Sequence, residues 1–152
     1  MWSSFVVFLL AAVTAAAQPA QVLTVSAPLR TSAKRGGEMT LKLTIKLKDG
    51  YHVNSNKPAE DYLIPLRLTW DKGPFEPLET VYPAPRLENY SFSAKPVSVF
   101  SGAFEVTARF RVAPSAPTGI TALSGKLRYQ ACTDKMCLPP RTVDVKAPVE
   151  VH

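Results

Sequence analysis

The chain has 152 residues, a formal net charge of +6 and 46% hydrophobic residues. Its basic residues are spread singly along the sequence, without a run of like charge or a cluster of aromatic and basic residues, which argues against nucleic-acid binding. A chain of this length is long enough to form one domain with its own hydrophobic core, without help from disulfides.

The N-terminus has the features of a secretory signal. An uncharged apolar run, Phe5–Val13, is followed by the small residues Ala15–Ala17, which suit a signal peptidase, although no Lys or Arg precedes the run. The run is shorter than the roughly 20 residues of a stable membrane-spanning helix. We therefore predict a signal peptide over residues 1–17 and a single exported domain over residues 18–152. The alternative is an uncleaved amphiphilic anchor.

The first predicted strands come soon after the predicted signal peptide. One short strand is expected from Leu23 towards Ser26. Between residues 39 and 48 apolar and polar residues alternate, which is typical of a strand with one buried face. Asp49-Gly50 then predicts a turn. The apolar members of the alternation are Met39, Leu41, Leu43, Ile45 and Leu47.

The rest of the chain predicts further strands joined by proline-rich connections. Alternation recurs over residues 66–70, 104–112 and 127–131, and a last strand is expected over residues 143–151. The connections are DKGPFEP, YPAPRLENYSFSAKP and APSAPTG. No stretch after the signal shows a helical period, and none is apolar enough to cross a membrane. Roughly seven short strands with turns between them indicate an all-β, two-sheet antiparallel β-sandwich.

Both cysteines lie in one segment, YQACTDKMCLPP, residues 129–140. If Cys132 lies opposite Cys137 in a hairpin, Leu127 faces Thr142, which pairs an inward residue with an outward one. One extra residue in the second strand would restore Leu127 opposite Val143. Because proline cannot donate to a strand ladder, we predict a bulge at Pro139-Pro140.

The residues alone leave three readings of the cysteine pair open. A structural disulfide is the ordinary default in an exported protein. A metal site is disfavoured, because the available partners are His52, His152, Met39 and Met136 and none has zinc-site spacing. Thiol–disulfide exchange is the third reading, and it needs no metal or other cofactor.

The segment YQACTDKMCLPP resembles the active-site segment of the amino-terminal periplasmic domain of the DsbD thiol:disulfide interchange family. In that family a Tyr-Gln-x-Cys is followed by a second cysteine and a Pro-Pro step. KDGYHVNSNKP, residues 48–58, resembles the early strand and loop of the same domain, and the similarity spans roughly residues 38–151. The cysteine spacing departs from the family, because four residues rather than five separate the cysteines. The full-length proteins also carry a membrane-spanning electron conduit and a thioredoxin-like domain, and we expect these functions to come from a separate polypeptide.

The resemblance implies an immunoglobulin-like sandwich with its redox pair at one end. It implies Cys137 as the nucleophile, Cys132 as the resolving cysteine, and a cap loop in residues 87–96 that carries Tyr90 or Phe92. Tyr129 and Gln130 are expected to frame the site, although Tyr129 is equally well a core aromatic with a satisfied hydroxyl. Tyr90 and Phe92 are equally well ordinary loop anchors. Lys135 could stabilise a thiolate and Asp134 could oppose it, but both are more often ordinary turn residues. His52 is a candidate for proton handling, and its default interpretation is a strand-end residue.

The partners implied are thioredoxin-like redox proteins, a separate membrane electron conduit and oxidised periplasmic thiol proteins. We therefore predict a periplasmic thiol–disulfide oxidoreductase that relays reducing equivalents. The competing prediction is a non-catalytic exported β-sandwich, used for binding or assembly, whose cysteines form an inert disulfide.

Overall fold

The computed structural model describes residues 21–152, and the predicted signal peptide lies outside them. Every regular element in this part of the chain is a β-strand, and within it there is no helix long and apolar enough to cross a membrane. The strands are β1 (Leu23–Ser26), β2 (Thr31–Ala33), β3 (Glu38–Leu47), β4 (His52–Asn54), β5 (Arg67–Trp70), β6 (Phe75–Val81), β7 (Arg86–Glu88), β8 (Val97–Ser101), β9 (Ala103–Val112), β10 (Gly119–Tyr129), β11 (Ala131–Cys132) and β12 (Arg141–Val151).

The first sheet has the strand order β1-β3-β9-β6, and all its pairs are antiparallel. The predicted alternation in β3 is confirmed, because every second residue from Met39 to Leu47 is buried. The outward face carries polar residues, and there Arg109 of β9 forms ion pairs with Glu38 and Glu79 at 3.0 Å each. The sheet therefore has one apolar and one solvated face, as antiparallel sheets commonly do.

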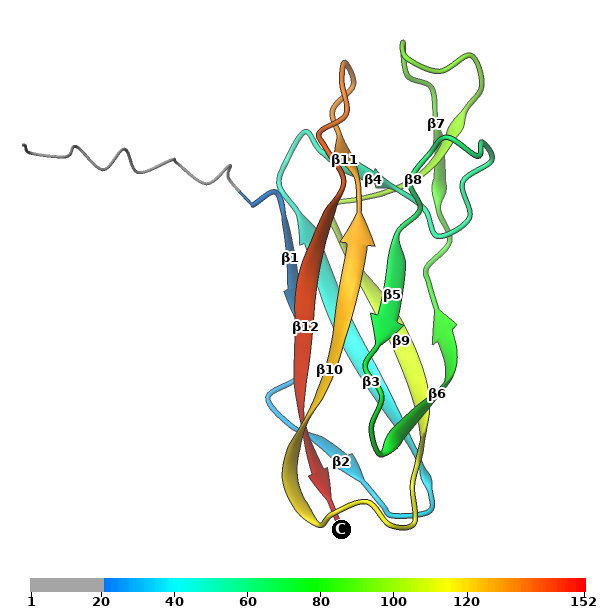
Figure 1. The fold of residues 1–152 in the computed structure, drawn as a ribbon. Helices are drawn as coiled ribbons and strands as arrows, with labels where there is room; N and C mark the ends of the chain where they lie inside the picture. The colour runs from blue at the N-terminus through cyan, green and yellow to red at the C-terminus, as the bar shows by residue number, and fades with distance from the viewer. Residues whose placement is uncertain (1–20) are drawn as a thin grey trace, which may run out of the picture.

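The second sheet has the order β2-β12-β10-β5. The long strands β10 and β12 pair over eleven residues, and β12 runs unbroken through Pro148 to Val151. Strand β2 pairs with β12 in parallel, at the end remote from the cysteines (Figure 1).

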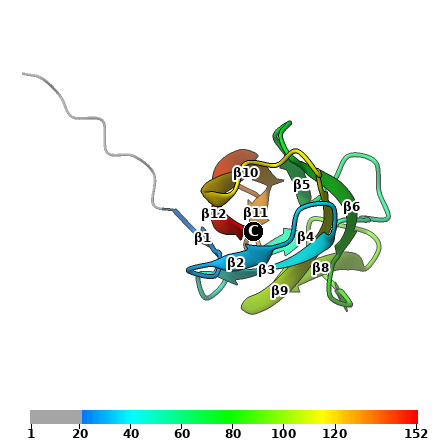
Figure 2. The same cartoon turned by 90° about the horizontal axis from the view of Figure 1, so that it is seen from below.

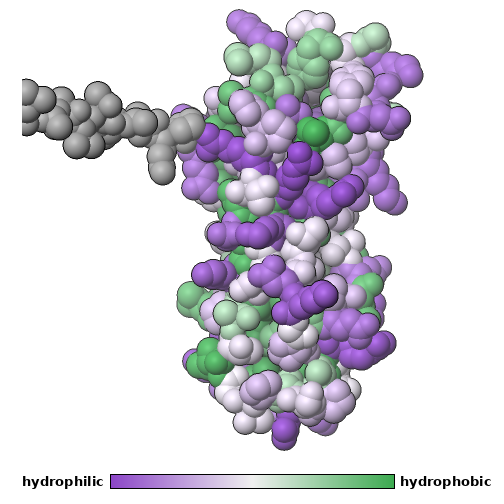
Figure 3. All heavy atoms as spheres, viewed as in Figure 1, coloured by the Kyte–Doolittle hydropathy of each residue, from purple (hydrophilic) through white to green (hydrophobic). Residues whose placement is uncertain are grey.

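The two sheets face each other and enclose the core, as the view along the strands shows (Figure 2). Phe110 of the first sheet and Trp70 of the second meet edge to face, with ring centroids 5.0 Å apart. On the face drawn in Figure 3, hydrophilic residues are spread along the strands and are not gathered in one place. The architecture is an immunoglobulin-like antiparallel β-sandwich, which confirms the predicted fold class.

A third, smaller sheet lies at one end of the sandwich, with the order β11-β4-β8-β7 (Figure 1). Its inner face continues the main core through Ala131, Val53 and Phe100. Its outer face carries a separate apolar cluster of Val97 and Val99 together with Leu63 from the loop before β5. The third sheet therefore has apolar residues on both faces.

The expected count of seven strands was too low. DKGPFEP and YPAPRLENYSFSAKP were predicted to be connections, but they contain the start of β6 and the whole of β7. All three residues of β7 are exposed, and six of the seven in β6 lie outside the core, so neither has the alternation that marks a half-buried strand. Strand β10 likewise begins at Gly119, earlier than predicted, in a stretch whose first residues are exposed.

Candidate functional site

The two cysteines lie at the tip of the hairpin formed by β10, β11 and β12. The turn between them is closed by the Thr133 amide, which donates to the Met136 carbonyl at 2.7 Å. The Thr133 hydroxyl also accepts hydrogen bonds from the amides of Lys135 and Met136. Such side-chain bonds to the following backbone fix a tight turn without glycine. The sequence TDKM therefore holds the tip in one conformation.

Cys132 and Cys137 face each other and form a disulfide, with an S–S distance of 2.00 Å and Cα atoms 3.9 Å apart. The backbone hydrogen bonds lie on either side of the pair, from Thr133 to Met136 and from Leu138 to Ala131. The cysteines thus occupy a non-hydrogen-bonded position of the ladder, where opposed side chains approach most closely. This register explains why the two sulfurs are within bonding reach.

The predicted bulge is present. Leu127 pairs with Val143 and Tyr129 with Arg141, whereas the cysteine pair is offset by one residue from that register. Three residues, 138–140, stand opposite the two residues 130 and 131, and Pro139-Pro140 occupy the break before β12 begins. The side-chain amide of Gln130 donates to the Leu138 carbonyl at 3.2 Å. Gln130 therefore connects the two strands across the bulge, next to the disulfide.

Cys132 lies on the outer face of the third sheet, opposite to the face of Ala131 and Tyr129, as the alternation predicts. This face is not open to solvent: Cys132 is fully buried, with an exposed fraction of 0%, whereas Cys137 is only partly buried. The two cysteines of the pair therefore differ in their exposure to solvent. The reason is that a second chain segment covers the outer face.

That covering segment is residues 89–96, which join β7 to β8 and are called the cap segment below. Its Tyr90 ring stacks on the His52 ring with centroids 4.1 Å apart and on Phe92 with centroids 5.2 Å apart. His52 in turn is the residue directly opposite Cys132 in the pairing of β4 with β11. The structure thus brings the cap segment, between β7 and β8, and the hairpin tip beyond β11 to the same end of the molecule (Figure 1).

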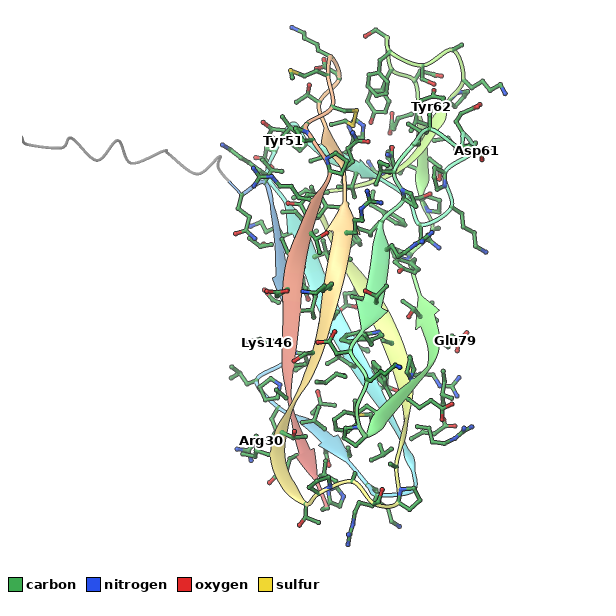
Figure 4. The ribbon with its side chains drawn as sticks, in the orientation of Figure 1. Arg30, Tyr51, Asp61, Tyr62, Glu79 and Lys146 are labelled. Atoms are coloured by element: carbon green, nitrogen blue, oxygen red, sulfur yellow. A yellow bond between two sulfur atoms is a disulfide. The ribbon has the colours of Figure 1, made fainter. Side chains whose placement is uncertain are left out.

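The cap segment is attached at three places. Tyr90 and Phe92 pack against the outer cluster of Leu63, Val97 and Val99. The Ser91 hydroxyl donates to the Asp134 carbonyl in the cysteine turn at 3.4 Å. Lys95 forms an ion pair of 3.1 Å with Glu60 in the loop between β4 and β5, the loop that also carries the labelled Asp61 and Tyr62 in Figure 4.

The loop between β4 and β5 is itself held by buried polar contacts. The Ser98 hydroxyl donates to the Ser55 hydroxyl at 2.8 Å, and the Ser55 amide donates to the Ser98 carbonyl at 2.8 Å. The side-chain amide of Asn54 donates to the Ile64 carbonyl. These bonds place Leu63 beneath the cap segment, so the cap rests on a fixed surface.

His52 is buried beside the disulfide, with an exposed fraction of 4%. Burial lowers the pKa of its imidazole below the usual value of 6.5, and the negative charges of Glu88 and Asp134 partly oppose the shift. The Nε2 atom is buried and has no hydrogen-bond partner among residues 21–152. Burial also raises the pKa of the stacked Tyr90 hydroxyl, and Glu88 and Asp134 act in the same direction.

Tyr129 belongs to the inner core and not to the capped face. Its ring is fully buried between the sheets, and burial raises the pKa of its hydroxyl while Arg141 opposes that shift. The hydroxyl oxygen has no hydrogen-bond partner in the described part of the chain, so the satisfied hydroxyl of the alternative reading is not observed. Tyr129 therefore lies in the core on the inner side of the sheet, and it is the residue before Gln130 in the chain.

The remaining polar candidates lie outside the covered face. Asp134 and Lys135 are exposed in the turn. The histidine, cysteine and carboxylate side chains of residues 21–152 form no group of three that would hold a metal ion. What the site offers chemically is a disulfide between one buried and one partly exposed cysteine, next to a cluster of aromatic rings.

Comparison with known proteins adds independent findings. The family model of the N-terminal part of the thiol:disulfide interchange protein DsbD matches residues 19–148. The crystal structure of the N-terminal periplasmic domain of ScsB from Proteus mirabilis is similar, with a TM-score of 0.60 and 13% identity. That similarity covers 86% of this chain and 47% of the ScsB chain, so this chain spans about half the length of that structure.

Two further solved structures are similar at a lower level. Murine CRIg has a TM-score of 0.37 and 9% identity, and the similarity covers 86% of this chain and 98% of the CRIg chain. A family 123 glycoside hydrolase from Clostridium perfringens has a TM-score of 0.35 and 13% identity, with 86% of this chain and 27% of the hydrolase covered. No curated protein sequence matches the chain.

Proposed function

The chain belongs to the family of DsbD N-terminal domains, and from this membership we propose that it relays reducing equivalents by thiol–disulfide exchange through Cys132 and Cys137. The family is one of thiol:disulfide interchange proteins, and the two cysteines here are joined in a disulfide. The observation that carries the proposal is the position of this disulfide. It lies at a hairpin tip beneath a separate aromatic segment and not between distant core strands, where it would stabilise the fold more.

The unequal burial of the two sulfurs supports an assignment of roles. An incoming thiolate attacks a disulfide along the S–S axis and forms a mixed disulfide. Cys137 is partly accessible and Cys132 fully buried, so an attacking partner reaches the Cys137 sulfur. Cys132 then leaves as the thiolate. A second thiol of the donor next attacks the mixed disulfide and releases Cys137, so that the domain has gained two electrons and two protons.

In the second half of the relay the electrons pass on. The Cys137 thiolate attacks the disulfide of an oxidised protein, one thiol of that protein leaves, and Cys132 attacks the sulfur of Cys137. The protein disulfide is reduced and the Cys132–Cys137 bond forms again. The proposed donor is a thioredoxin-like protein fed by a membrane electron conduit, and the proposed acceptors are oxidised thiol proteins of the periplasm. Periplasmic location is part of the proposal, as is the predicted domain of residues 18–152 behind a cleaved signal.

The proposal is tested by trapping. Cys132→Ser leaves the mixed disulfide on Cys137 without its resolving thiol, so we expect it to accumulate covalent complexes in periplasmic extract that dithiothreitol releases. The matched control is Cys137→Ser, which keeps only the buried sulfur and should trap little. If neither variant traps a protein and the native disulfide resists reduction by thioredoxin, the alternative of an inert disulfide in a binding or assembly module holds.

A further inference from the structure

His52 and Cys132 are direct neighbours across two strands. In the pairing of β4 with β11 they stand opposite each other, and opposed residues of an antiparallel pair lie on the same face with Cβ atoms about 4.5–5.5 Å apart. Cys137 is opposite Cys132 on its other side. The order across this face is therefore Cys137, Cys132, His52, and the cap segment covers the last two.

The environment of His52 differs from that of a histidine that only fills space. Its ring is buried and held in a stack by Tyr90, yet its Nε2 has no hydrogen-bond partner among the described residues. A buried polar atom without a partner costs free energy, on the order of 1–3 kcal/mol. In the tautomer with the proton on Nδ1, Nε2 is an acceptor. The imidazole is thus a base beside a sulfur, in a place closed to water.

The relay creates a need for such a base. When Cys132 resolves the mixed disulfide it must attack as a thiolate, because the thiol is a poor nucleophile. Burial disfavours the charged thiolate relative to the neutral thiol, and Cys132 is fully buried. Without a proton acceptor nearby, the resolving step would therefore be slow at neutral pH.

We propose that His52 accepts the proton of the Cys132 thiol while Cys132 resolves the mixed disulfide; this inference rests on the proposed relay. The S–H proton passes to the imidazole and the Cys132 sulfur forms a bond to the Cys137 sulfur. The bond between Cys137 and the partner sulfur breaks, and the partner leaves with the electron pair. The leaving thiolate takes up a proton from the imidazolium, which leaves His52 neutral. If the thiolate is protonated by water instead, the imidazolium releases its proton to the solvent and His52 is again neutral.

The charges around His52 suit a transient positive charge. Glu88 at the end of β7 and Asp134 in the cysteine turn favour the imidazolium, and the stacked Tyr90 ring adds a cation–π contact. Ser101, opposite His52 on β8, carries no charge. Burial has the larger effect and keeps the pKa of His52 below 6.5, so the ring is neutral and ready to accept a proton at pH 7.

The experiment uses Ellman's reagent as the probe, so that no partner needs to be known. The reduced protein releases one thionitrobenzoate when Cys137 attacks the reagent and a second when Cys132 resolves the mixed disulfide; Cys132→Ser lacks the second phase. In the wild type we expect the second phase to reach a plateau above the pKa of His52. In His52→Phe, which keeps an aromatic ring against Tyr90, its rate should rise with pH until the thiol ionises, at about pH 8.5 or above.

At pH 7 the second phase of His52→Phe should be about a hundredfold slower, the low end of the effect of general bases. His52→Tyr provides a second ring-bearing variant should the first fail to fold, and His152→Phe, which removes the other histidine, is the matched control. If the second-phase rate of the variants has the same pH dependence as that of the wild type, whatever its absolute value, the inference is overturned, because a packing defect slows the step equally at all pH values. Protein reduced in denaturant and then refolded gives this readout even if the trapping experiment fails.

Discussion

Tyr90 is the cap residue whose ring lies closest to His52, with centroids 4.1 Å apart. Its ring also stacks on Phe92, whose centroid lies 6.4 Å from that of His52, and both cap rings pack against the outer apolar cluster. Ring stacking of this kind contributes about 0.5–1.5 kcal/mol per pair beyond the buried area. The free energy that holds the cap closed is therefore small enough for a docking partner to overcome.

Removal of these rings should open the site. In a Cys132→Ser background, where Cys137 is the single thiol, we expect Tyr90→Ala with Phe92→Ala to speed alkylation by iodoacetamide about tenfold, which corresponds to 1.4 kcal/mol of lost cover. Tyr62→Ala is the control, because that ring is 63% exposed on the neighbouring loop. Mass spectrometry gives the rate. An unchanged rate in a folded double variant would contradict a capping role.

The candidate residues differ in how far the sequence could predict them. The cysteines were found because they are the only two in the chain and both lie in one recognisable segment, and their bulge followed from counting residues against the core register. Tyr90 and Phe92 came from the resemblance alone, since nothing in their spacing shows what they contact. For His52 the sequence offered proton handling only as an alternative to a strand-end residue, because its place opposite Cys132 depends on a strand pairing between distant segments.

Among the elements, the contact of β10 with β5 depends on a residue without a side chain. Gly125 pairs with Trp70, and a Cβ atom at this position would lie 2.5 Å from the Thr69 carbonyl oxygen and 2.7 Å from Cε3 of Trp70. Trp70 cannot move away freely, because its ring packs edge-on against Phe110 in the core. The close approach of β5 to β10 thus requires glycine.

Gly125→Ala should therefore destabilise the domain, although alanine is ordinarily favoured over glycine within a strand. Overpacking of this kind costs about 1–3 kcal/mol. Gly73→Ala is the matched control, since a Cβ there has no atom within 4 Å, and it should be neutral or slightly stabilising. Urea unfolding measures both. Equal free energies of unfolding for the two variants would show that β5 shifts without cost.

The strands that the sequence predicted are those with one clean apolar face. Alternation identified β3, β9 and the paired ends of β10 and β12, because each buries every second residue between the two sheets. The third sheet was missed for the opposite reason. All three residues of β4 are buried, since the core lies on one face and the cap on the other, so a period of two is absent.

At the scale of the whole molecule, two apolar clusters are kept apart. The large one lies between the sheets, and the small one lies outside the third sheet beneath the cap segment. Since hydrophobic stabilisation follows buried apolar area, the fold depends mainly on the large cluster. Changes at the end that carries the cysteines should therefore leave the sandwich intact.

Loss of the disulfide tests this separation. The bond joins residues only five positions apart, so loop-closure entropy gives it about 2 kcal/mol. We expect Cys132→Ser with Cys137→Ser to stay folded, with a free energy of unfolding lower by about that amount in urea and a cooperative transition. The reduced wild type serves as the comparison. A variant that no longer folds would mean that the hairpin tip stabilises the whole domain.

The proline step after Cys137 has a consequence for how such domains can diverge. A cysteine six positions after Cys132 would share the register of Leu127 and Val143, and no bulge would then be needed. Here the second cysteine comes one position sooner, and the bulge at Pro139-Pro140 restores the register of the core strands. Insertions or deletions at the apex can thus be offset a few residues away, so lineages can vary the spacing of the sulfurs while each interior side chain keeps its side of the sheet.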